Sequence, residues 1–221
     1  MAVLIHPDDR EAALRVAETY LETKPDEYEN EFRLRAASGD HRWIRTYGRV
    51  VERDASGEAQ RMIGNHEDIT ERRKAEEMEE RFQALVEQTP LAIEIHSVDG
   101  RFLMTNPAYS RISGLHGAEL QAVKETYDLR RDEQLLRRGF GPLLERLYGG
   151  ETIEFPVHDY SVSEEASGLG IEVSDTDSLW LRSVGFPLKN SAGRTEAVVL
   201  MTEDITERKQ AERALREAEA K

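Results

Sequence analysis

The stretch Glu67-Asp-Ile-Thr-Glu-Arg72 recurs further along the chain as Glu203-Asp-Ile-Thr-Glu-Arg208. Upstream of each copy lies a second matching pair, Trp43-Ile-Arg-Thr-Tyr-Gly48 and Trp180-Leu-Arg-Ser-Val-Gly185. Between the paired blocks lie two turn sequences, Asp54-Ala-Ser-Gly57 and Asn190-Ser-Ala-Gly193. Three matches in the same order indicate that the chain holds two copies of one structural unit.

Each copy has the pattern strand, turn, strand, helix. Runs of apolar and β-branched residues bounded by turns predict strands at 28–37, 41–53 and 60–66 in the first copy. In the second copy they predict strands at 153–161, 179–188 and 196–202. The repeated motif therefore lies where the last strand of each copy passes into a charged helix.

The motif has the features of a helix start. Asp68 and Asp204 are suited to accept from the first free backbone N–H groups, and Glu71 and Glu207 follow three residues later, as in a capping box. A threonine in each copy offers a competing cap. One interpretation is a good helix start and nothing more. The other is a rigid joint that transmits motion from sheet to helix, through Asp68, Thr70, Glu71, Arg72, Asp204, Thr206, Glu207 and Arg208.

The helices that follow the motif carry an apolar stripe. In the first, spacings of three and four residues alternate along Ala75, Met78, Phe82, Leu85 and Thr89. In the second, the stripe is Ala211, Ala214 and Ala218, with Leu215 beside it. The stripe predicts either a coiled coil between two chains, hence a homodimer, or an amphipathic helix that packs on its own domain.

The second copy has further elements upstream. The pattern predicts strands at 90–97 and 102–105, joined by a turn at 98–101, and a helix that opens at Asn106-Pro107. A helix end and loop follow at 110–117, and a longer helix at 135–148 ends at Gly149-Gly150. The predicted order is two strands, three helices, three strands and an exit helix.

This second copy resembles a PAS domain, the sensory module common in bacterial signalling proteins. The resemblance covers about 82–221 in full and 4–80 in part, where 5–10 resembles the start of the family's long helix. The residues that carry it are Pro90-Leu-Ala-Ile-Glu-Ile, Asp99-Gly-Arg-Phe102, Asn106-Pro-Ala-Tyr109, Trp180-Leu-Arg-Ser-Val-Gly-Phe-Pro-Leu188 and Glu203-Asp-Ile-Thr-Glu-Arg-Lys209.

The resemblance implies an α+β fold with a five-stranded antiparallel sheet, helices on one face, and helical linkers. We expect a partial PAS domain at 1–70, a helical linker at 71–89, a complete PAS domain at 90–206 and an exit helix at 207–221. The first copy lacks its opening strands, which leaves one sheet edge unpaired. The second copy has extra residues at 163–178, which we expect to form an enlarged hairpin loop.

Composition removes several classes of function. The 221 residues carry a formal net charge of −14, which disfavours contact with nucleic acid or an anionic membrane. The chain has no cysteine, no signal-peptide pattern and no apolar run long enough for a spanning helix, so we expect a cytoplasmic segment whose parent protein could be anchored elsewhere. The six histidines have no metal-ligand spacing, so no metal site is predicted.

Two signals of enzymatic chemistry are weak. His66-Glu67 resembles a kinase phosphoacceptor pair, but the second copy has Thr202 in place of the histidine. The stretch 149–155 resembles a diguanylate cyclase signature with the wrong spacing. We therefore predict no catalytic residue and no enzyme. No cofactor is required, and both haem and cysteine-linked chromophores are disfavoured, because the helix at 135–148 lacks histidine and the chain lacks cysteine.

We predict a sensory module that relays a stimulus or a dimer state through its exit helices to an output domain outside this chain, typically in a sensor histidine kinase. The alternatives are a fragment of a signalling enzyme, either a diguanylate cyclase or a histidine kinase, and a ligand-free dimerisation adaptor. The expected partners are a second copy, the output domain and a small-molecule ligand. Strand alternation and side-chain polarity suggest cavity residues Ile93, Ile95, Tyr109, Tyr127, Phe155, Val157, His158, Arg182, Val199 and Met201.

Overall fold

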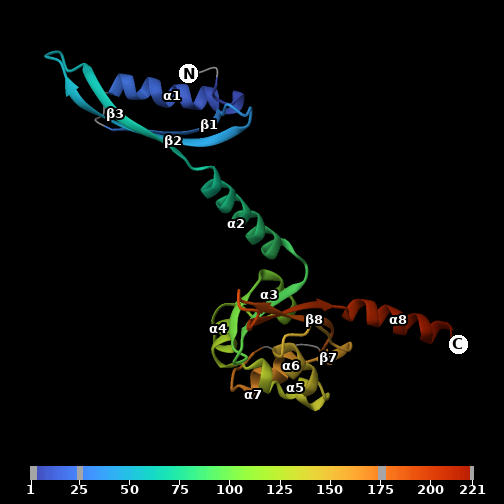
Figure 1. Cartoon of the computed structure of the whole chain (residues 1–221). Coiled ribbons are helices and arrows are strands. Elements are labelled where there is room, and N and C mark those ends of the chain that lie inside the picture. The colour runs from blue at the N-terminus through green and yellow to red at the C-terminus, as the bar shows by residue number, and fades with distance from the viewer. Residues whose placement is uncertain (1–3, 24–26, 174–177, 220–221) are drawn as a thin grey trace. The chain divides into compact units, whose positions relative to one another are not determined.

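A computed structural model describes residues 4–23, 27–173 and 178–219. The chain divides into two compact units, Met1–Phe82 and Gln83–Lys221, and each unit is described separately (Figure 1). The structure confirms the predicted α+β class, with one antiparallel sheet in each unit and a partial first copy.

The first unit is a helix on a three-stranded antiparallel sheet. Helix α1 (Pro7–Thr23) lies along the sheet of β1 (Glu27–Arg35), β2 (His41–Arg53) and β3 (Ala59–Asp68), whose order is β1-β2-β3 (Figure 1). Its core is small and consists of Ile5, Ala13 and Phe32, with Leu34 packed against them. The carboxylate of Asp9 accepts from the backbone and the guanidinium of Arg33, which fixes the start of the helix to β1.

The free edge of this sheet is β3, as expected for a copy without its opening strands. Every residue of β3 is exposed. Strand β9 (Thr195–Asp204), which carries the same motif in the second unit, is buried from Ala197 to Leu200 because it lies between two neighbouring strands. Strand β3 is thus an exposed edge strand, although it ends in the same Glu-Asp pair as β9.

Helix α2 (Thr70–Gln88) follows β3 and has no buried residue. Its large apolar side chains Met78, Phe82 and Leu85 are 66%, 62% and 72% exposed. These residues belong to the predicted stripe of alternating three- and four-residue spacings. The stripe therefore lies open along the helix and does not pack on a sheet.

The second unit has five strand positions, in the order β5-β4-β9-β8-β6. They are formed by β4 (Ala92–Ser97), β5 (Phe102–Thr105), β6 (Ile153–Glu154), β8 (Leu179–Lys189) and β9. The predicted strand at 153–161 is interrupted: β7 (His158–Tyr160) pairs separately with β8. Pro156 lies in the interruption and has no N–H to donate to a strand partner.

The helical region between β5 and β6 differs from the prediction in two places. Helix α3 (Pro107–Ser113) ends at Gly114, but the segment predicted as loop leads into a further helix, α4 (Gly117–Thr126). The predicted helix at 135–148 is two helices, α5 (Glu133–Arg137) and α6 (Gly141–Tyr148), preceded by a short 3-10 turn, η2 (Leu129–Arg131). The break falls at Gly139, whose φ of 80° is left-handed and ends α5.

The extra residues of the second copy are not simply a hairpin loop. Val162–Gly168 form helix α7, in which Val162 and Ala166 are buried. Residues 174–177 of the predicted loop lie outside the described residues. Ser161 caps the helix by accepting from the N–H of Glu164, so a serine-rich and acidic sequence forms a helix start. This short helix adds a wall to the core of the second unit.

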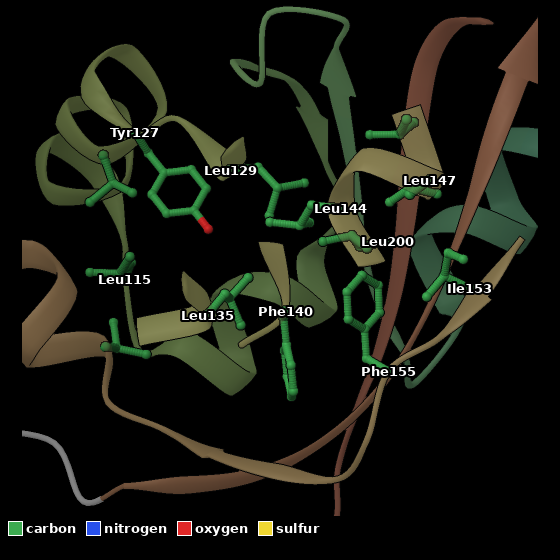
Figure 2. Close-up of a cluster of buried hydrophobic side chains, with 13 residues drawn as sticks. Leu115, Tyr127, Leu129, Leu135, Phe140, Leu144, Leu147, Ile153, Phe155 and Leu200 are labelled. Carbon is green, nitrogen blue, oxygen red and sulfur yellow. The ribbon is translucent and has the colours of Figure 1, made fainter. Parts of the chain in front are cut away.

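The core of the second unit lies between the sheet and these helices. Figure 2 shows Tyr127 directing its hydroxyl into a cluster of leucines, opposite the rings of Phe140 and Phe155. Leu147 is fully buried and packs on Gly185, where a Cβ atom would stand 2.8 Å from the leucine. A side chain at position 185 would therefore push α6 away from β8. Helix α8 (Thr206–Glu219) leaves the end of β9.

Candidate functional site

The second unit encloses a cavity of about 90 Å³ between the inner face of its sheet and helices α3, α4 and α7. This volume holds several waters and is well below the several hundred Å³ of drug-sized pockets. Its walls are mostly aliphatic and aromatic. The polar groups that line it are Glu94, Tyr109, Ser113, Tyr127, His158, Tyr160, Glu165, Ser183 and Thr202.

Four of the ten predicted cavity residues line this cavity: Tyr109, Tyr127, Phe155 and His158. The other six, which do not, are Ile93, Ile95, Val157, Arg182, Val199 and Met201. On β4 and β9 the prediction chose the wrong face, because the more apolar face of each strand was assigned to the interior. The inner face instead carries Ala92 and Glu94 on β4, and Leu200 and Thr202 on β9.

The misassigned residues form the outer face of the sheet. Strand register places Ile93 beside Met201 and Ile95 beside Val199. On the next strand these rows continue with Val184 and Phe186. Arg182 is also on this side, where its guanidinium pairs with Glu203, and Val157 is exposed in the connection between β6 and β7. The outer face of β4, with Ile93 and Ile95, is thus more apolar than its inner face, with Ala92 and Glu94.

Asp132 organises one end of the cavity. It is 1% exposed, and one carboxylate oxygen accepts from the hydroxyls of Tyr127 at 2.7 Å and Tyr160 at 2.8 Å. The other oxygen accepts from the N–H of Leu135 at 2.9 Å and so caps α5. Both tyrosines line the cavity, so this one carboxylate holds two of its lining side chains in place. Burial is the main reason why the pKa of Tyr127 lies well above its ordinary value.

Glu94 and His96 form a second polar pair on the inner face of β4. The Nε2 atom of His96 lies 3.1 Å from a carboxylate oxygen of Glu94, and the Nδ1 atom lies 3.2 Å from the carbonyl oxygen of Gly100. A carbonyl oxygen accepts only, so Nδ1 carries a proton. The imidazole is thus held between a backbone carbonyl and the carboxylate of Glu94.

Glu165 of α7 is the second carboxylate that lines the cavity. Desolvation, followed by the nearby charge of Asp132, raises its pKa to about 7, and hydrogen bonding with Tyr160 and Gln134 partly offsets this. In the part of the chain that the structure describes, Glu165 forms no ion pair with a lysine or an arginine. Its ionised form is therefore an uncompensated charge in a partly buried site.

We expect Glu165→Gln to change how stability depends on pH. The raised pKa means that the folded state favours the protonated acid, so this contribution to stability is present at pH 4.5 and is lost as pH rises through 7. Glutamine resembles the protonated acid at every pH. The variant should melt at nearly the same temperature as the wild type at pH 4, below the ordinary pKa of 4.5, and at a higher temperature at pH 8, measured by calorimetry. Equal melting temperatures at both pH values would contradict this.

His158 and Tyr109 complete the polar lining. The Nδ1 atom of His158 lies 3.0 Å from the carbonyl oxygen of Pro156, and burial lowers the histidine pKa, which favours a neutral ring. The partly buried Tyr109 lines the cavity, and its hydroxyl has no hydrogen-bond partner among the described residues. Burial, followed by the charge of Glu94, raises its pKa well above the ordinary value. Sequence reasoning found these two residues but missed Glu94 and Glu165.

The repeated motif forms the same joint in both units. The hydroxyls of Thr70 and Thr206 accept from the backbone N–H of Trp43 at 2.9 Å and Trp180 at 2.8 Å. They therefore bind the neighbouring strand and do not act as competing helix caps. In each unit the tryptophan carbonyl also accepts from the N–H of the motif isoleucine. Two hydrogen bonds in each unit thus connect the tryptophan of one strand to the isoleucine and threonine at the start of the helix.

The remaining motif residues have separate partners. The carboxylates of Asp68 and Asp204 accept from the N–H groups of the two threonines, at 3.0 Å and 2.9 Å. Hydrogen bonds from Thr70 and then Arg42 lower the pKa of Asp68 to about 2. Glu71 pairs with Lys74, not with the helix start. Arg72 pairs with Glu31, Arg208 pairs with Glu212, and Glu207 is exposed.

A cation covers each tryptophan at the joint. The guanidinium of Arg73 lies 5.1 Å from the ring centre of Trp43, and the ammonium of Lys209 lies 5.8 Å from that of Trp180. Both cations lie three residues beyond the motif threonine, one turn into the helix. The strand and the helix are therefore joined by side chains as well as by backbone.

A buried cavity on the inner face of a sheet, with a bonded joint from that sheet to an exit helix, defines an α+β sensory unit. A family described as PAS fold matches residues 1–66, and a second family, also described as PAS fold, matches 86–210. The second match alone covers more than half of the chain. The chain therefore belongs to the PAS fold family, and its units are of the sensory type typical of signalling proteins.

One longer protein and several solved structures are similar to this chain. The uncharacterized protein y4lL of Sinorhizobium fredii is 28% identical over 218 residues, which cover 96% of this chain and 24% of the relative. This chain thus spans about a quarter of that relative's length. A solved sensory box histidine kinase/response regulator from Burkholderia thailandensis is 35% identical, with coverage of 38% of this chain and 63% of that chain and a TM-score of 0.35.

A domain of a sensory box sensor histidine kinase/response regulator from Geobacter sulfurreducens is 20% identical, with coverage of 57% of this chain and 94% of that chain and a TM-score of 0.42. No helix within the described ranges is long and apolar enough to cross a bilayer.

Proposed function

We propose that the second unit is a ligand sensor whose output is helix α8, and that the parent protein is a signalling protein such as a sensor histidine kinase. The observation that supports this is the continuity of β8 and β9. Leu181 and Leu200 of these strands line the cavity, and β8 begins and β9 ends at the joint that carries α8. A change in cavity occupancy alters how these strands pack, and the joint passes this change to the helix by a population shift.

The relay can be tested by filling the cavity without any ligand. Ala166 of α7 is buried and lines the cavity, so Ala166→Leu places a larger side chain inside. We expect this variant to alter hydrogen exchange in β8, β9 and α8, measured by mass spectrometry on the whole chain. Adding Thr206→Val removes the acceptor of the Trp180 N–H, so the change should then stop at β9.

Thr70→Val is the matched control, because it makes the same change at the joint of the first unit. With Ala166→Leu it should leave the response of α8 intact. The proposed relay would be contradicted if Ala166→Leu changed hydrogen exchange in β8 and β9 while the α8 amides exchanged at the wild-type rate.

We further propose that the chain forms a homodimer through α2. The observation that favours this is the open apolar stripe of Met78, Phe82 and Leu85, whose spacing suits packing between two parallel helices. Such a dimer would present two exit helices to the output domain together.

Phe82→Glu should therefore give a monomer at micromolar concentration, where the wild-type chain sediments as a dimer. Burying a charge in the seam between two helices is unfavourable. Gln83→Glu adds the same charge at the next position, off the stripe, and should remain dimeric. Sedimentation velocity distinguishes these outcomes, and a wild-type chain that stays monomeric at high concentration would contradict the proposal.

A further inference from the structure

The charge of the cavity lining points to a class of ligand. Two carboxylates, Glu94 and Glu165, line the cavity, and Asp132 lies behind two of its tyrosines. Among the residues that the structure describes, no lysine or arginine lines it. Arg138, which lies close enough to affect His158, is already paired with Asp159 at 2.9 Å.

The donors around Asp132 do not cancel its charge. They are two tyrosine hydroxyls and a backbone N–H, which are neutral groups. Glu94 differs, because its carboxylate lies 3.1 Å from the imidazole of His96. When Glu165 is ionised, the cavity region thus holds the charges of Glu165 and Asp132 without a counter-ion, in surroundings that screen charge weakly.

The walls are suited to a cation as well. Rings of Tyr109, Tyr127, Tyr160 and Phe155 surround the space, and aromatic faces attract cations such as ammonium groups. The hydroxyl of Tyr109 lines the cavity with its oxygen free to accept a hydrogen bond from a ligand. An N–H donor with a short alkyl chain would use the carboxylate, the ring faces and the leucine walls together.

We propose that this cavity binds a small organic cation, an alkylammonium ion of a few carbon atoms, with Glu165 as its counter-ion and the tyrosine rings as its cage. This inference rests on the proposed sensor function and specifies the ligand class for the same cavity. The cation would neutralise Glu165, which lies on α7 and belongs to the insert of the second copy. Selectivity for charge would thus come from the insert, and the sheet would supply the relay.

Three probes are propylammonium, 1-propanol and acetate, which have four non-hydrogen atoms each. A comparison of their binding tests the effect of charge at constant size. We expect propylammonium to shift amide resonances of α7, β8 and β9 in NMR titrations of the whole chain, with a millimolar dissociation constant. Acetate and 1-propanol should bind at least about tenfold more weakly, because neither offers a positive charge to Glu165.

The variant Glu165→Gln should weaken propylammonium binding about tenfold or more. Glu164→Gln is the matched control: it removes the same charge from the adjacent residue, which is exposed and paired with Arg137 on the surface. Its affinity should equal that of the wild type. The Glu165→Gln spectrum must keep the wild-type dispersion, which shows that the fold is intact.

A third arm uses only the wild-type protein. The groups around Glu165 are Asp132 and Glu133 at α5, Tyr160 of β7, Tyr109 of α3 and Gln134, while Glu94 and His96 face the cavity from β4. With a pKa of about 7 for Glu165, its ionised fraction rises about tenfold between pH 6 and pH 8. Propylammonium affinity should rise by a similar factor, since the amine stays protonated over this range.

The outcomes separate this inference from the sensor function. Equal shifts by 1-propanol or acetate would overturn the cation assignment and leave a ligand cavity in place. An affinity that Glu165→Gln leaves unchanged would also overturn it. If no probe shifts cavity residues, the cation inference fails, while the Ala166→Leu exchange experiment still tests the relay independently.

Discussion

Asp132→Ala is expected to cost about 3–4 kcal/mol of the unfolding free energy of the second unit. The substitution leaves two buried tyrosine hydroxyls without their acceptor, each costing about 1–2 kcal/mol, and it removes the cap of α5, which costs about 1 kcal/mol. Relief from burying a carboxylate offsets part of this loss. The measurement is the hydrogen exchange of β9 amides under conditions that report unfolding of this unit.

Two variants of Asp132 and its surroundings sharpen this prediction. Asp132→Asn keeps an acceptor oxygen for the hydroxyls and should lose about half as much. Asp159→Ala removes an exposed carboxylate that pairs with Arg138, and such surface pairs contribute less than about 1 kcal/mol. A loss below about 1 kcal/mol in Asp132→Ala would show that the buried hydroxyls find other partners.

Asn106→Ala is expected to cost about 3 kcal/mol in the same unit. The asparagine is 3% exposed, and its amide oxygen accepts from the N–H groups of Ile93 and Tyr109. Its amide nitrogen donates to the carbonyls of Val86 and Leu91, both at 2.9 Å. Alanine removes all four bonds and the cap of α3, at about 0.5–1.5 kcal/mol for each bond.

The effect of Asn106→Ala should extend to α2, because Val86 lies in the last turn of that helix. We expect faster hydrogen exchange in the last turn of α2 as well as in β4. Asn190→Ala is the control, since Asn190 holds an exposed hairpin turn through two bonds to its own loop. A variant in which only β4 responds would show that Asn106 does not fix the end of α2.

Sequence reasoning was reliable where short-range rules decide the structure. The repeat located five of the six strands of the two copies to within about two residues, and Asn106-Pro107 marked a helix start that the structure confirms. Both depend on hydrogen-bonding rules that act over a few residues. The resemblance to a known family supplied the five-stranded antiparallel sheet with helices on one face, which no local rule provides.

The parts that were missed depend on tertiary packing. Gly139 divides a segment that was predicted as one helix, and Pro156 divides a segment that was predicted as one strand. Both breaks were missed because periodicity alone does not show where the chain must turn. The cavity face of β4 was assigned wrongly because Ile93 and Ile95 are more apolar than Glu94 and His96. Charged residues that alternate with isoleucine in a central strand were a signal for a polar cavity.

The two joints also have a spectroscopic consequence. The chain contains two tryptophans, and each lies at one joint beneath a lysine or an arginine of the following helix. Tryptophan fluorescence therefore arises only from the two places where a strand passes into a helix. Replacing Trp43 or Trp180 by phenylalanine would leave a single tryptophan. The fluorescence of each joint could then be measured separately and without an added dye.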